Sequence, residues 1–172
     1  MSPWPGTSLA AGRARADLTL SGDADLALRL FITTLLAVAV GTEREFHGHP
    51  AGMRTMALVG VGACLFTALG LEPLFGGRTD PTRIAAQVVT GVGFLGAGAI
   101  LRTGNEVHGL TTAASIWVVA ALGMCIGFGF YFVGIFTTAL VLITLVLIRP
   151  VESRLFRRAK ARRDAGKDAE IS

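Results

Sequence analysis

The sequence predicts an all-α, polytopic integral membrane protein with five transmembrane helices, and three observations support this. Apolar residues make up 52% of the 172 residues, and the mean hydropathy is +0.59. Charged residues make up only 16%, compared with about a quarter in ordinary soluble domains. The 22 glycines are typical of closely packed transmembrane helices, whereas two cysteines are too few for a disulfide-stapled scaffold. This composition argues against both a water-soluble globule and a disordered chain.

Apolar segments of the length that a bilayer requires, about 20 residues, define the spans. The predicted spans are 26–42, 54–71, 84–102, 110–127 and 130–149. The first contains Arg29 near its start, where a long side chain can reach the headgroups. The run from Val107 to Ile148 is too long for one helix, since its 42 residues would measure about 63 Å. We therefore expect a hinge at Gly127-Phe128-Gly129.

Three segments follow from these spans. We expect a flexible extension over 1–23, a transmembrane domain over 24–150 and a basic cytoplasmic tail over 151–172. The extension lacks the apolar core of a signal peptide. Eight basic residues from Arg149 onward place the tail inside and the amino terminus outside. They also explain the isoelectric point near 9.8, so nucleic-acid binding is not needed to account for it.

Two short loops on the predicted cytoplasmic side carry most of the polar groups near the membrane. The candidate polar, partner-binding cluster consists of Glu43, Arg44, Arg54, Arg102, Thr111 and Thr112. Pairing Glu43 with one of these arginines, shielded from water, would be costly to break one side at a time. In the alternative interpretation, which the residues alone favour, the charges only fix helix ends and topology.

Metal and enzyme chemistry find little support in the sequence. His47 and His49, near Glu43 and Glu45, offer too few convergent ligands for an ordinary zinc site. No Asp or Glu lies inside spans two to five, which argues against a magnesium path through the monomer. The sequence contains no recognisable pairing of a catalytic nucleophile with a general base, so it predicts neither an enzyme nor a cofactor.

Glycines and a few polar residues mark the helix faces. Gly91 to Gly96 formally match a dinucleotide fingerprint, but no strand precedes them. We interpret the glycines as helix-packing residues: Gly91, Gly93, Gly96, Gly98, Gly123 and Gly127. A glycine-lined ion or lipid groove is the alternative. Gln87 and Thr90 are intramembrane polar groups, and the amide is expected to bond to a facing helix.

Three ordered motifs resemble the MgtC/SapB family of bacterial inner-membrane proteins. They read PAGMRTMALVGVGACLF after an ERE triplet, DPTRIAAQVVTGVGFLGAGAILR, and VHGLTTAASIWVVAALGMCIGFG. The resemblance covers roughly 26–155. The positions that match by resemblance are Glu43, Arg44, Ala51, Gly52, Arg54, Asp80, Pro81, Arg83, Gln87, Gly91, Gly93, Gly96, Gly98, Arg102, Gly109, Leu110, Thr111, Thr112, Ala113 and Trp117.

The resemblance implies a multi-pass protein of the bacterial inner membrane. It further implies a regulator of growth under low magnesium and, in pathogens, of survival inside macrophages. Members of the family are thought to bind other membrane complexes, notably F-type ATP synthase. Longer members carry a soluble carboxy-terminal ACT-like domain, and this chain is expected to be a short member without it. The competing hypothesis is a small homo-oligomeric ion transporter or channel.

Overall fold

The computed structural model describes residues 9–71, 80–104 and 106–148, and for residues 9–21 and 81 it describes the backbone alone. Five helices follow one another along the chain: α1 (Leu9–Phe46), α2 (Met53–Leu71), α3 (Pro81–Gly98), α4 (Leu110–Gly127) and a last helix, Tyr131–Ile148. The predicted basic tail, 151–172, lies outside the described residues.

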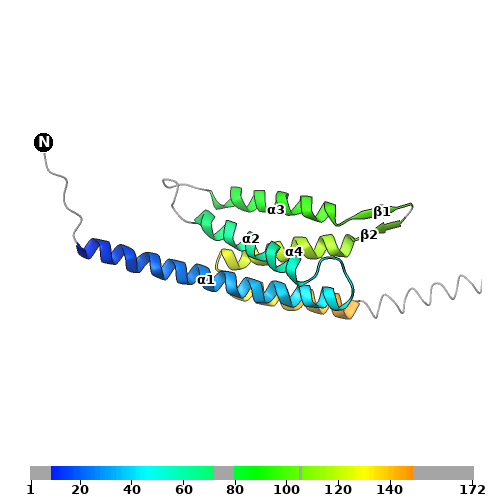
Figure 1. The fold of residues 1–172 in the computed structure, drawn as a ribbon, viewed down its shortest axis with the longest axis horizontal. Coiled ribbons are helices and arrows are strands. Elements are labelled where there is room, and N and C mark those ends of the chain that lie inside the picture. The colour runs from blue at the N-terminus through cyan, green and yellow to red at the C-terminus, as the bar shows by residue number, and fades with distance from the viewer. Residues whose placement is uncertain (1–8, 72–79, 105, 149–172) are drawn as a thin grey trace, which may run out of the picture.

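The helices form an antiparallel bundle in which neighbours in sequence are neighbours in space. Helix α2 packs against α1 and α4, and α3 runs along α2 and α4 on one side (Figure 1). The first part of α1 projects beyond the other helices, because its 38 residues measure about 57 Å (Figure 1). Helix α1 begins at Leu9, within the stretch that we expected to be a flexible extension.

Four of these helices are long and apolar enough to cross a membrane: Gly22–Phe46, α2, α4 and the last helix. This confirms a helical, multi-pass membrane protein. Helix α3, over which a span was also predicted, is 18 residues long and includes Arg83, Gln87 and Thr90, which lower its hydropathy. The predicted hinge after α4 is confirmed, because α4 ends at Gly127 and the next helix begins four residues later.

The end of α3 also differs from the prediction. Helix α3 ends at Gly98 rather than at residue 102, and a two-stranded hairpin follows, with β1 (Leu101–Thr103) paired antiparallel to β2 (Glu106–His108). Gly104 adopts a φ of 62°, as a two-residue hairpin turn requires. Hydropathy could not separate this hairpin from the end of a helix, since Ile100 and Leu101 continue the apolar run.

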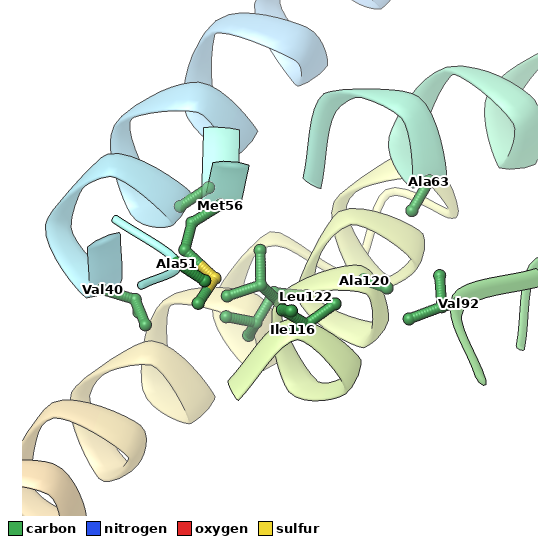
Figure 2. Close-up of a cluster of buried hydrophobic side chains, with 10 residues drawn as sticks. Val40, Ala51, Met56, Ala63, Val92, Ile116, Ala120 and Leu122 are labelled. Carbon is green, nitrogen blue, oxygen red and sulfur yellow. The ribbon is translucent and has the colours of Figure 1, made fainter. Parts of the chain in front are cut away.

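The core is small in volume and built largely from small side chains. Val40 on α1, Met56 on α2 and Ile116 on α4 converge at its centre (Figure 2). Large apolar side chains instead point outward, and Phe94 and Phe132 are 82% and 79% exposed. A surface of that kind needs lipid to cover it.

Glycines bring α2 and α4 into backbone contact. A Cβ at Gly123 would overlap the carbonyl of Gly60, and one at Gly127 would lie 2.8 Å from the carbonyl oxygen of Cys64. Only glycine allows this approach. These two positions on α4 are among the glycines that the sequence singled out as packing residues.

Candidate functional site

Polar side chains gather at the two ends of the bundle. We call one the Arg44 end: it contains the last turn of α1, the first turns of α2 and α4, and the hairpin. The other is the Arg29 end: it contains Asp25 and Arg29 of α1, the start of α3 and the turn between α4 and the last helix. The two arginines are separated by about 22 Å along α1, somewhat less than the hydrocarbon thickness of a bilayer.

At the Arg44 end, a buried arginine joins α1 to α4. Arg44 is 1% exposed, and its Nη2 donates a hydrogen bond of 2.6 Å to Oγ1 of Thr112, which is also buried. A buried guanidinium needs such partners because water no longer solvates it. Its place in the last turn of α1 also suits the negative end of the helix dipole. The structure thus joins two of the six predicted cluster residues.

For the other four predicted cluster residues, the structure shows exposed side chains or other contacts. Glu43 Oε1 lies 3.0 Å from Nδ1 of His47, so its recorded ionic partner is one turn ahead on α1 rather than Arg54 or Arg102. Neither Arg54 nor Arg102 is the partner of Glu43 among the described residues, and the expected pairing of Glu43 with Arg44 stays a prediction. Both arginines are exposed, and Arg102 donates to the carbonyl of Gly104 within the hairpin. Thr111 is exposed at the start of α4.

Glu45, which sequence reasoning did not assign, caps α2 from the neighbouring helix. Its Oε2 accepts a 3.0 Å hydrogen bond from the backbone N–H of Met53, the first residue of α2. A carboxylate there satisfies one of the free amides of a helix start and is favoured by its dipole. Gly41 and Gly52 leave room for this close loop, since a Cβ on either would meet atoms within 2.6 Å.

The Arg29 end ties three helices together. Arg29 forms a 2.6 Å ion pair with Asp25, and its Nη1 donates a 2.6 Å hydrogen bond to the carbonyl of Gly127. The hydroxyl of Tyr131 donates to the second oxygen of Asp25. Arg29 therefore binds a free carbonyl at the end of α4, in addition to lying near the predicted membrane surface. Only the spacing of Asp25 and Arg29, four residues apart, could have indicated the pair.

Between these two ends, the buried polar side chains of the described helices are hydroxyls. Ser115 and Thr138 donate to carbonyls one turn back, 2.7 and 2.8 Å away. Thr33 and Thr67 are almost fully buried. Among the described residues, no three His, Cys, Asp or Glu side chains come together in a way that could hold a metal ion.

A groove of about 980 Å³ lies between α2 and α3. Gln87 lines it and is exposed, so its amide does not face a helix partner as we had expected. Thr90 bonds to its own helix through the carbonyl of Ala86. Of the predicted packing glycines of α3, Gly96 faces Ala113 of α4. The other three, Gly91, Gly93 and Gly98, face open space within this chain.

Residues 30–154, which include both polar ends apart from Asp25 and Arg29, match the model of the MgtC family. The chain belongs to the MgtC family. A relative from Escherichia coli (strain K12), named "Putative magnesium transporter YhiD", is 43% identical over 141 residues. Protein MgtC of Salmonella typhimurium (strain LT2) is 40% identical over 128 residues, and Protein SapB of Bacillus subtilis (strain 168) is 41% identical over 116 residues.

These matches cover 77%, 74% and 63% of this MgtC-family chain. They cover 64%, 54% and 50% of the three relatives, so the chain spans about half to two thirds of their length. No solved structure gives a significant match.

Proposed function

We propose that this chain is a non-enzymatic regulator in the bacterial inner membrane that supports adaptation to low magnesium or a related ionic stress. In this proposal α3 is the fifth span, the amino terminus faces outside and the tail faces the cytoplasm. The length of α3 and its packing along two helices that are apolar enough to span support the five-span count. The Arg44 end then faces the cytoplasm.

The observation that carries the proposal is the charge of the buried groups. Arg44 is buried at one end of the bundle, and the half-buried Arg29 is paired with Asp25 at the other. Between them, the described helices contain hydroxyls and no carboxylate. Magnesium prefers carboxylate oxygens and retained waters, and a buried guanidinium repels a divalent cation. The monomer is therefore better suited to a rigid binding scaffold than to a magnesium path.

We propose that the regulator acts by binding another membrane complex, with F-type ATP synthase as the candidate that family membership suggests. The exposed groups of the Arg44 end would form the contact, because Arg54 and the hairpin residues Arg102 and Glu106 are exposed on the side that would face the cytoplasm in the proposed orientation.

Affinity purification of the tagged chain from membranes, followed by mass analysis of co-purifying proteins, tests this contact. We expect Arg54→Ala combined with Arg102→Ala to release the partner while helix content and monodispersity stay unchanged. If the double variant recovers as much partner as the wild-type chain, the contact lies elsewhere. Purification of the wild-type chain without any membrane complex would refute the binding role.

The alternative is a small homo-oligomeric transporter, which the name of the relative from Escherichia coli favours. Purified protein in liposomes loaded with a magnesium-sensitive dye distinguishes the two. The regulator hypothesis predicts a signal equal to that of protein-free liposomes. Magnesium influx that rises with the protein-to-lipid ratio would overturn the regulator hypothesis and support the transporter.

A further inference from the structure

Glycines from both helices line the groove between α2 and α3. Gly62 of α2 and Gly91 of α3 both line it, and a Cβ at either position would meet nothing within 4 Å. The two helices do touch near the Arg29 end, where a Cβ at Gly70 would meet the side chain of Ile84. The groove therefore lies along α3 beside a point where the two helices are in contact.

The groove changes from polar to apolar along α3. Asp80 and Arg83 line it at the Arg29 end, Gln87 follows one turn deeper, and Val88 and Leu95 line the remainder. Arg83 and Gln87 are separated by about 6 Å along the helix axis, and Gln87 and Leu95 by about 12 Å. The last distance is close to the thickness of one leaflet's hydrocarbon, about 15 Å. A molecule with a charged head and a long apolar tail matches this order.

The charged groups at the mouth, Asp80 and Arg83, are opposite in sign, and both are exposed within the described chain. Within the described chain, no ion pair within 4 Å joins Arg83 to a carboxylate. Oδ1 of Asp80 accepts hydrogen bonds from the backbone N–H and the hydroxyl of Thr82, 2.9 and 2.7 Å away. These bonds hold the pKa of Asp80 below its usual range, so the carboxylate is charged at neutral pH. The mouth thus offers a cation and an anion side by side.

We infer that this groove binds a membrane phospholipid with a zwitterionic phosphoethanolamine headgroup. The guanidinium of Arg83 binds the phosphate, the carboxylate of Asp80 accepts from the primary ammonium, and the amide of Gln87 reaches the ester carbonyls. The acyl chain occupies the apolar part beside Gly91. A helix from a second copy is the competing occupant, which the measurement of dimer and lipid retention below distinguishes. The inference rests on the proposed placement of α3 in the membrane, and not on the identity of the partner.

Native mass spectrometry of the full chain in detergent, titrated with single phospholipids, tests the site. We expect one phosphatidylethanolamine retained per chain, more tightly than phosphatidylcholine, whose quaternary ammonium cannot donate to Asp80. Phosphatidylglycerol, which lacks the ammonium, should also bind more weakly. Arg83→Gln should weaken retention about tenfold or more, because a charge-assisted bond to the phosphate is lost. Asp80→Asn keeps a good helix cap but should abolish the preference for ethanolamine over choline.

A matched pair of glycine variants locates the lipid. Gly91→Leu fills the groove and should remove lipid retention, whereas Gly93→Leu adds the same side chain to an open face of α3 that does not line it. Gly62→Leu fills the groove from α2 and should act like Gly91→Leu, and circular dichroism confirms folding of each variant.

Three results would overturn the inference. Equal retention by Gly91→Leu and Gly93→Leu would exclude the groove as the site. Equal retention of the ethanolamine and choline lipids would refute the headgroup assignment. A dimer of the wild-type chain that retains no lipid and that Gly91→Leu dissociates would assign the groove to a second copy. Because the readout is lipid mass and not partner binding, none of these results depends on the proposed regulatory partner.

Discussion

Thr112→Val provides a direct test of the buried contact between α1 and α4. Valine has nearly the same shape as threonine but cannot accept the 2.6 Å hydrogen bond from Arg44, which is 1% exposed. Hydrogen bonds to charged groups contribute about 1.5–3 kcal/mol. Hydrogen bonds between membrane helices average about 0.6 kcal/mol, because the unfolded chain in the bilayer finds other partners. We expect the upper range here, since the donor is a buried charge.

The assay is reversible unfolding in mixed micelles, followed by circular dichroism. Thr111→Val is the matched control, because it makes the same change one position earlier, where the side chain is exposed. The free energy of unfolding should fall by about 1.5–3 kcal/mol for Thr112→Val and by less than about 0.5 kcal/mol for Thr111→Val. Equal effects of the two variants would refute the reasoning that Arg44 depends on this acceptor.

Three further predictions concern packing, the α1 terminus and pH. Gly123→Leu should abolish a monodisperse, folded product on size-exclusion chromatography, because its Cβ overlaps the Gly60 carbonyl, whereas Gly98→Leu, which meets open space, should not. Glu43→Ala should lower the midpoint temperature of unfolding more than Glu106→Ala, since the Glu43 side chain is 10% exposed and the Glu106 side chain 80%. Equal midpoints would mean that Glu43 contributes no more to stability than an exposed side chain. Asp80 has a lowered pKa, so its stabilising contribution is complete above the usual aspartate pKa and is lost as pH falls through the lowered value. Between pH 7 and pH 3, the midpoint temperature of thermal unfolding should therefore fall less steeply for Asp80→Asn than for the wild-type chain. Identical pH dependences of the two midpoints would contradict a stabilising role of the Asp80 carboxylate.

The sequence predicted the helices well where hydropathy and length decide the outcome. The hinge at Gly127 could be predicted because no single helix of 42 residues fits a bilayer. Arg44 and Thr112 were both candidates, since each lies beside a span boundary on the same predicted face. Their mutual contact could not be predicted, because it depends on the rotation of two helices about their axes.

Other contacts left no readable pattern in the sequence. The partner of Arg29 at the end of α4 is a backbone carbonyl, and every residue carries one, so residue identity does not reveal it. Glu45 caps a helix that begins eight residues later, outside the local spacing of an ordinary capping residue. The hairpin was missed although Gly104 begins a Gly-Asn pair, a recognised hairpin turn.

The bond from Arg29 to the carbonyl of Gly127 links residues 98 positions apart in the chain. During synthesis, the turn between α4 and the last helix emerges long after α1 has entered the bilayer. A helix made early therefore supplies the donor for a carbonyl at a turn made much later, so this contact forms only after both have entered the bilayer. A chain whose first helix is delayed or missing would insert its final hairpin with an open carbonyl at the turn.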